Sequence, residues 1–246
     1  MKYNKLLLIV LITGMSFSFR ENNNVSESMV IVELFTSEGC SSCPAADELL
    51  QEMPGILNKE NKQVIGISFH VTYWNRLGWE DPYSNELYTE RQKKYVSKLE
   101  LPQVYTPQAI VNGETEFVGS NPVAFRDLVT SALMKSHPYE IQAQVAKESD
   151  KINLRYELNR DPKNIVLNMA VVEVNVVHYI PRGENKNRTL KHSNVVRVFE
   201  TIAPQKSGNM SIRLPQDLAA EKCSIVLYTQ NPKTLKINGV TKLDLE

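Results

Sequence analysis

The chain is poor in cysteine and has no excess of charge of either sign. It contains three cysteines in 246 residues, whereas a disulfide framework in an exported domain usually needs four or more. Lysine and arginine together number 28, and aspartate and glutamate also number 28. Because these charges cancel, no long-range field attracts nucleic acid or an anionic membrane. The composition therefore argues against a disulfide-stapled scaffold and against a nucleic-acid partner.

Long apolar runs are also scarce. The exception is Leu6–Phe19, which follows Lys2 and Lys5 and precedes the polar stretch Arg20–Asn24. The run is shorter than the about 20 residues that a membrane-spanning helix needs. Its basic start and short apolar centre are typical of a secretory signal peptide. We therefore expect a signal peptide over residues 1–22 and a periplasmic or secreted protein, with membrane contact only if this segment stays uncleaved.

From residue 27 to residue 138, strand and helix patterns alternate. The expected strands are 29–35, 64–71, 108–111 and 114–118, and the expected helices begin near Pro44, Ser84 and Pro122. Pro54-Gly55 is expected to end or kink the first helix. Asn112-Gly113, between the last two strands, is a strong hairpin signal. The order β-α-β-α-β-β-α predicts an α/β domain over residues 27–138.

Beyond residue 138, short apolar runs alternate with polar turns. The expected strands are 140–146, 152–158, 165–180, 195–202, 210–214 and 223–229. Short strands joined by polar turns are typical of an antiparallel β-sandwich. We therefore expect a second, β-sandwich domain over residues 139–246, and an α+β protein as a whole.

The spacing Cys40-Ser41-Ser42-Cys43 lies between a predicted strand and the helix that begins at Pro44. A helix N-terminus offers unpaired N–H donors and a partial positive charge. A thiolate at Cys40 is stabilised there, and the thiolate is the attacking form in disulfide exchange. Cys43 lies within disulfide reach and can resolve a mixed disulfide. The pattern predicts a redox pair in which Cys40 attacks and Cys43 resolves.

Two other interpretations of this pair remain open. A fixed disulfide could staple the loop, although so short a ring closes little chain and gains little stability. Two thiolates could also hold Cu(I) or half of a zinc site, with His70 as the nearby third ligand. The alternatives are therefore a copper-binding module and a redox-inert binding module. We expect no bound metal and no cofactor, and we expect Cys223 to be a buried apolar side chain rather than a third redox thiol.

Thr106-Pro107 stands just before the predicted strand 108–111. A cis-proline that opens this strand can face the C-x-x-C pair and leave backbone groups free for an extended substrate. The alternative is an ordinary trans-proline at the start of a strand. We predict that Thr106 and Pro107 bind substrate.

Several runs resemble a family of uncharacterised secreted bacterial thioredoxin-like proteins, a domain of unknown function. They are Val32–Asp47, His70–Trp74, Leu77–Trp79, Arg91-Gln92 and Thr106–Gln108, with weaker likeness at Arg182–Asn185 and Asn194–Arg197. The likeness is strong over roughly residues 30–135. It implies a thioredoxin-like fold for residues 27–138. It also implies redox chemistry, although the family has no settled substrate. We expect a thiol–disulfide oxidoreductase whose substrate is a protein or a small molecule that carries a thiol or a disulfide.

Three further residues are candidates for supporting roles. Glu33 resembles the buried carboxylate by which thioredoxins accept a proton from the resolving cysteine; the alternative is a solvent-facing or salt-bridged residue. His70, as a cation, would lower a thiolate pKa, unless it is a satisfied structural histidine. Trp74, with Tyr73 and Trp79, could form an apolar platform for a ligand or could pack structurally against the domain.

Overall fold

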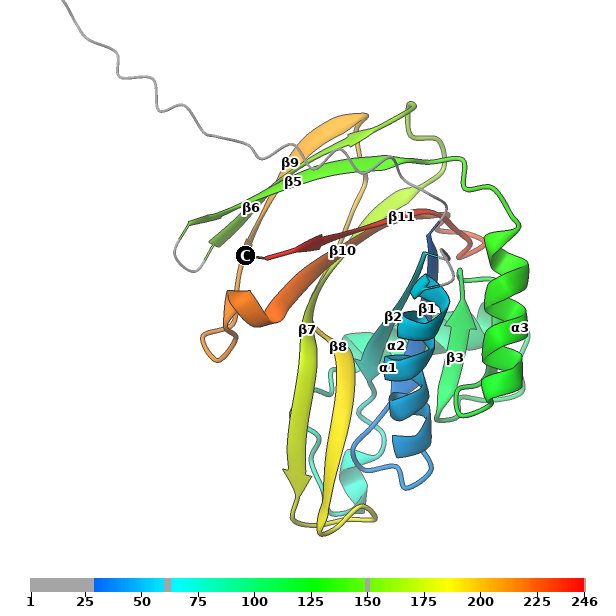
Figure 1. The fold of residues 1–246 in the computed structure, drawn as a ribbon, viewed down its shortest axis with the longest axis vertical. Coiled ribbons are helices and arrows are strands. Elements are labelled where there is room, and N and C mark those ends of the chain that lie inside the picture. The colour runs from blue at the N-terminus through cyan, green and yellow to red at the C-terminus, as the bar shows by residue number, and fades with distance from the viewer. Residues whose placement is uncertain (1–28, 60–62, 149–150, 246) are drawn as a thin grey trace, which may run out of the picture.

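The computed structural model describes residues 29–59, 63–148 and 151–245, and the predicted signal peptide lies outside them. Within these residues, eight strands form one mixed sheet and three strands form a second, antiparallel sheet. Three α-helices lie against the larger sheet (Figure 1). The α+β class expected from the sequence is confirmed.

The N-terminal half has the predicted order of elements. They are β1 (Val30–Thr36), α1 (Pro44–Lys59), β2 (Val64–His70), α2 (Glu86–Lys98), β3 (Gln108–Val111), β4 (Thr115–Val118) and α3 (Pro122–Leu133). Of the two outcomes expected at Pro54-Gly55, an end of the first helix is wrong, because α1 continues through Pro54 to Lys59. Helix α2 is capped by Asn85, whose side chain accepts a hydrogen bond from the Leu87 amide.

The C-terminal half is built of strands, as predicted. They are β5 (Ile141–Glu148), β6 (Lys151–Leu158), β7 (Val166–Ile180), β8 (Arg188–Ile202), β9 (Ser207–Arg213), β10 (Cys223–Gln230) and β11 (Ile237–Asp244). Sequence analysis missed β11 and the first part of β8. Both are rich in polar residues, and each forms by pairing along an apolar neighbour: His192 of β8 lies opposite Val176, and Thr241 of β11 lies opposite Leu227.

The larger sheet runs through both halves of the chain. Its strand order is β11-β10-β7-β8-β2-β1-β3-β4, and the halves meet where β2 and β8 run parallel with Ser68 opposite Val195. Two side chains reinforce this junction: the Ser68 hydroxyl donates to the Ser193 carbonyl at 3.2 Å, and the Asn194 amide donates to the Gly66 carbonyl at 2.7 Å. The strands on either side of residue 138 therefore share one sheet.

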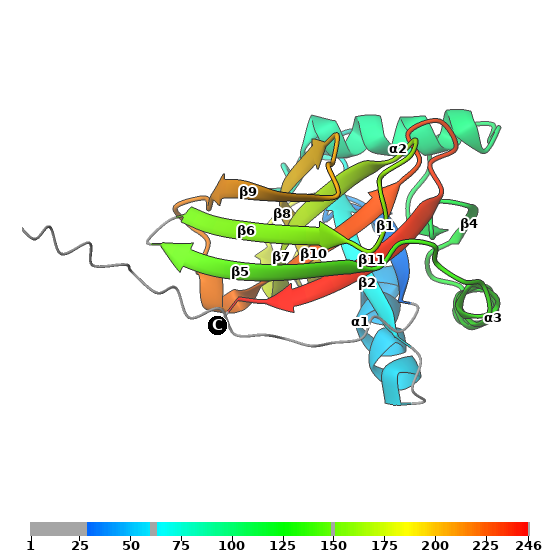
Figure 2. The same cartoon turned by 90° about the horizontal axis from the view of Figure 1, so that it is seen from above.

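Each face of this sheet has its own core. Along β1, Val32 and Leu34 pack with α1 and α3, while Ile31 and Phe35 pack on the other face, which α2 covers (Figure 2). The three-stranded sheet β5-β6-β9 packs on β7, β10 and β11 through a third core. This layering presents the carboxyl end of β1 and the start of α1 to the long β7–β8 hairpin. No helix among the described residues combines the length and hydropathy needed to cross a membrane.

Candidate functional site

Cys40 and Cys43 form a disulfide, with their Cα atoms 5.4 Å apart. The bond lies in the turn that joins β1 to α1. The carbonyl of Cys43 accepts from the amides of Ala46 and Asp47 at 2.8 and 3.1 Å, so the helical hydrogen bonds begin at the second cysteine. Pro44 occupies the first helical position, where its missing N–H costs nothing. The predicted C-x-x-C disulfide at a helix start is confirmed.

The Thr106-Pro107 peptide bond is cis, and Thr106 contacts the disulfide. Its hydroxyl donates to Cys40 Sγ at 3.2 Å and accepts from the Trp74 indole nitrogen at 2.8 Å. The Pro107 carbonyl already accepts from the Gly119 amide at 2.9 Å. The structure thus brings Thr106, Pro107 and Trp74 to the cysteine pair; their part in substrate binding stays a prediction.

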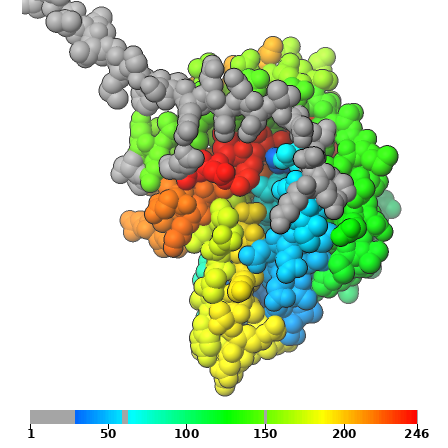
Figure 3. All heavy atoms as spheres, viewed as in Figure 1, coloured from blue at the N-terminus to red at the C-terminus, as the bar shows by residue number. Residues whose placement is uncertain are grey.

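Both cysteines are completely buried, with an exposed fraction of 0%. The tip of the β7–β8 hairpin holds the loop that carries them (Figures 1 and 3). The Asn185 side-chain amide donates to the carbonyls of Glu38 and Cys40, each at 2.9 Å. The Glu184 carboxylate accepts from the Ser41 amide at 3.1 Å. The C-terminal half of the chain therefore forms part of the wall around the disulfide.

A group of acids and histidines, all buried except the half-buried His178, lies next to the same loop. Glu38 accepts from the Trp79 indole at 2.8 Å and lies 2.8 Å from His178 Nδ1. His70 Nδ1 lies 2.7 Å from the Asp81 carboxylate, which also accepts from the Glu38 amide at 2.8 Å. Burial raises the pKa of Asp81, but His70 and the backbone amides outweigh it and hold that pKa below its usual value. His70 is thus placed as a partner of Asp81, and its predicted effect on the thiolate stays a prediction.

Glu33 is buried, but on the face of the sheet that α2 covers. Its carboxylate accepts from Arg91 at 2.7 and 2.9 Å and from the Tyr228 hydroxyl at 2.9 Å, and it also accepts from the Tyr95 hydroxyl. Burial raises the pKa of both tyrosines well above the usual value, so both hydroxyls remain donors. The structure therefore gives Glu33 an ion pair with Arg91, while α1 packs on the opposite face.

Two other predictions concern cysteine chemistry and metals. Cys223 is buried, its thiol donates to the Ala219 carbonyl at 3.2 Å, and burial raises its pKa to about 11. In the part of the chain that the structure describes, no group of three or more histidine, cysteine or acidic side chains is arranged to hold a metal ion.

Sequence analysis missed the residues that come to the loop from afar. His192 of β8 is buried between Glu38 and Asp47, which lie close to the cysteines in the sequence and were also missed, and Asn185 contacts Cys40 from 145 positions away. One local signal could have identified His192: it alternates with Leu190 at the buried positions of a strand. A lone histidine in such an alternation has to find a polar partner.

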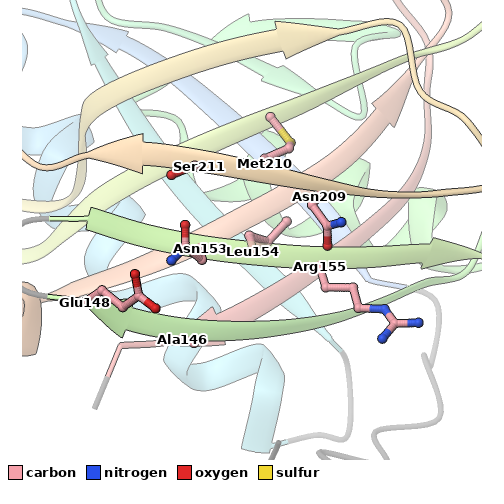
Figure 4. Close-up of a pocket in the computed structure, with 8 residues that line it drawn as sticks. All are labelled: Ala146, Glu148, Asn153, Leu154, Arg155, Asn209, Met210 and Ser211. Carbon is pink, nitrogen blue, oxygen red and sulfur yellow. The ribbon is translucent and has the colours of Figure 1, made fainter. Parts of the chain in front are cut away.

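A pocket of about 360 Å³ lies away from this loop, on the three-stranded sheet. Strands β5, β6 and β9 supply its walls, which include Leu154, Arg155 and Met210 (Figure 4). None of the residues lining it belongs to the C-x-x-C loop or its partners. The disulfide and its surroundings therefore remain the candidate functional site.

The β-α-β-α-β-β-α order, the C-x-x-C disulfide at the start of α1 and the cis-proline before β3 define a thioredoxin-like fold. The chain belongs to the DUF1223 family, described as a protein of unknown function, whose model matches residues 31–230. No curated protein matches the chain.

Two solved structures are similar over most of the chain. Protein AGR_C_4864 from Agrobacterium tumefaciens is 27% identical with a TM-score of 0.66, covering 90% of this chain and 96% of that one. HBP35 of Porphyromonas gingivalis is 15% identical with a TM-score of 0.64, covering 89% of this chain and 76% of that one. The second likeness concerns the fold alone.

Proposed function

We propose that this protein is an exported thiol–disulfide oxidoreductase that acts through Cys40 and Cys43. The observation that carries the proposal is the Thr106 hydroxyl, beside cis Pro107, donating to Cys40 Sγ at 3.2 Å at the start of α1. Export rests on the signal-peptide pattern of residues 1–22, which favours the periplasm or the cell exterior. The partner we propose is a protein or a small molecule that carries a thiol or a disulfide.

The reaction follows from the chemistry of a dithiol. In the reduced protein the Cys40 thiolate attacks one sulfur of a substrate disulfide; the substrate S–S bond breaks, and its other sulfur leaves and takes up a proton. The thiolate of Cys43 then attacks Cys40, forms the Cys40–Cys43 bond and releases the second substrate sulfur. Two electrons have passed to the substrate, and a dithiol substrate reverses the sequence. The positive end of α1 stabilises the thiolates in either direction.

Burial of both sulfurs requires a movement before exchange. A substrate sulfur must approach Cys40 Sγ along the line of the S–S bond, and Cys40 has no exposed surface. Asn185 and Glu184, at the tip of the β7–β8 hairpin, form hydrogen bonds with the backbone of the loop that carries the cysteines. We therefore propose that local opening of this tip admits the substrate.

Replacing Asn185 with alanine is expected to speed reduction of the disulfide by dithiothreitol about thirtyfold. The change removes the two hydrogen bonds from its amide to Glu38 and Cys40, and each is worth roughly 1 kcal/mol against opening. Lys186→Ala, at the exposed neighbouring position, is the matched control and should reduce at the wild-type rate. Equal rates in all three proteins would show that the substrate reaches the sulfur by another route.

A redox titration with thiol trapping tests the proposed function directly. The protein is equilibrated in glutathione or dithiothreitol buffers, alkylated and resolved by mass. A midpoint between about −270 and −120 mV supports an exchanging pair, whereas a midpoint below about −300 mV identifies a structural bond and overturns the proposal. Cys223→Ser should titrate like the wild type, because that thiol is buried in the C-terminal half.

One observation favours a second function, that of a redox-inert binding protein. Neither cysteine has exposed surface, as expected of a disulfide that only staples its loop. In that case the midpoint falls below about −300 mV. Cys40→Ser would then leave the function intact, so the same titration separates the two.

A further inference from the structure

His192 of β8 lies between two buried carboxylates that flank the C-x-x-C pair. Its Nε2 is 3.4 Å from Glu38 Oε1, and its Nδ1 is 3.4 Å from Asp47 Oδ2. Glu38 precedes the first cysteine in the loop, and Asp47 follows the second by one helical turn. All three side chains are buried, with exposed fractions of 0% to 2%. One ring therefore joins the two ends of the segment that carries the disulfide.

Side chains from several elements set the charge around this ring. Asp47 also accepts from the Thr36 hydroxyl at 3.1 Å, which fixes its carboxylate at the end of β1. The titratable groups that face His192 or its immediate partners are Glu38, Asp47, His70, Asp81, Tyr83 and His178. Two carboxylates contact the ring directly, so the surroundings favour its charged form.

The charge of the ring agrees with this geometry. Burial lowers the pKa of His192, but Asp47 and Glu38 outweigh it and raise the pKa to about 10. The ring is then an imidazolium at neutral pH, and it offsets one of the two negative charges that it contacts. Removing the ring would leave the two carboxylates of the cysteine-bearing segment without the cation that joins them, and nearby negative charge raises a thiol pKa.

We propose that His192 is a positioning residue for the redox pair: it bridges Glu38 and Asp47 and balances their charge beside Cys40 and Cys43. The inference rests on the proposed function, since a charge that tunes these sulfurs matters only if they exchange. It assigns the β7–β8 hairpin a second role beyond covering the disulfide, because β8 supplies a buried cation that contacts both Glu38 and Asp47.

The free energy of unfolding should depend on pH because of this cation. A histidine whose pKa is raised in the folded state stabilises it fully below the unfolded value of 6.5, and the stabilisation is lost as pH rises toward about 10. Wild-type stability in urea should therefore fall across that window. His192→Gln should lose most of this fall, and an unchanged profile in the variant would contradict the charge assignment.

The decisive experiment measures the thiol pKa of Cys40 in variants of opposite charge. The protein is first reduced with a phosphine, and the rate of alkylation at Cys40 is then followed against pH by mass spectrometry. His192→Gln should raise the pKa by about one unit, a tenfold loss of thiolate at neutral pH. Asp47→Asn, which removes an anion, should lower it by a similar amount. The double variant should return near the wild type.

Controls separate charge from structural damage. His178→Gln also removes a histidine from Glu38, but this side chain is 31% exposed, so solvent screens it and its shift should be less than half as large. The proposal would be overturned if His192→Gln and Asp47→Asn shifted the thiol pKa of Cys40 in the same direction. It would also be overturned if His178→Gln shifted that pKa as much as His192→Gln does. If His192→Gln does not fold, Asp47→Asn and the double variant decide by the same criterion.

This comparison does not depend on exchange with a physiological partner. If only the phosphine reduces the wild-type disulfide, the proposed function is overturned. The thiol pKa of Cys40 can still be compared between the wild type and the variants. If the wild-type protein exchanges disulfides but neither His192→Gln nor Asp47→Asn shifts the thiol pKa of Cys40, the role of His192 is overturned and the proposed function is not.

Discussion

A chain with Cys43→Ser is expected to accumulate a mixed disulfide at Cys40, whereas a chain with Cys40→Ser should accumulate none. In the first variant the Cys40 thiolate still attacks, but no neighbouring thiol releases the substrate. In the second variant the attacking atom is a hydroxyl, which is hardly ionised at neutral pH. Turnover of a disulfide substrate should fall at least about a hundredfold in either variant. Non-reducing gels of proteins mixed with a disulfide-bonded substrate, with mass analysis of the adduct, provide the measurement.

The third cysteine offers the matched control for this experiment. Cys223→Ser should retain wild-type turnover and form no adduct, because its thiol is buried and bonded to the Ala219 carbonyl. An adduct that forms equally at Cys43 in the Cys40→Ser chain would reverse the assigned roles. Full turnover in both single variants would show that the pair takes no part in the chemistry.

Arg91→Met is expected to cost the folded state about 3–5 kcal/mol. Arg91 is the cation that pairs with the fully buried Glu33, and its guanidinium also lies 4.9 to 5.7 Å from the ring centres of Phe69, Tyr95, Phe199 and Tyr228. Burial lowers the pKa of Arg91, but Glu33 and the tyrosines outweigh it and raise that pKa above its usual value. Loss of the arginine leaves a buried carboxylate without a counter-ion.

Urea unfolding of the single and double variants measures this effect. Glu33→Gln combined with Arg91→Met removes both charges and should recover much of the lost stability, because a neutral amide costs less to bury than an unpaired carboxylate. Arg126→Met on the exposed side of α3 should change stability by less than about 0.5 kcal/mol. Equal losses in the single and double variants would show that packing of the arginine, not its charge, supports the fold.

Local patterns predicted the parts of the site that are local in sequence. The C-x-x-C spacing of Cys40 and Cys43, followed by a proline at a first helical position, predicts the loop from Cys40 to Pro44. Thr106-Pro107 stands directly before a strand, a position that favours a cis bond over the trans alternative, and the bond is cis. Each of these features is fixed within a few residues of chain, so single-sequence patterns are sufficient for it.

The rest of the site depends on contacts between distant segments. Alternation along β1 shows that Glu33 faces away from Val32 and Leu34, but it does not tell which face α1 covers. The single parallel pairing of Ser68 with Val195 leaves no periodic mark in either strand. That pairing places His192 and Asn185 next to the loop that carries Cys40 and Cys43. The sequence therefore predicts two groups of strands and not the continuous sheet that joins them.

Because the larger sheet includes strands from both halves of the chain, the Cys40–Cys43 bond can form before the sheet is complete. Cys40 and Cys43 are three positions apart, so their bond needs only a short stretch of nascent chain, whereas Asn185 stands 145 positions downstream. Chains emerge from the N-terminus, and contacts between distant segments form late. An oxidant can therefore reach the pair before its wall has been made. Once the last strands join the sheet, the exchange that we propose at the pair would require the tip of the β7–β8 hairpin to open.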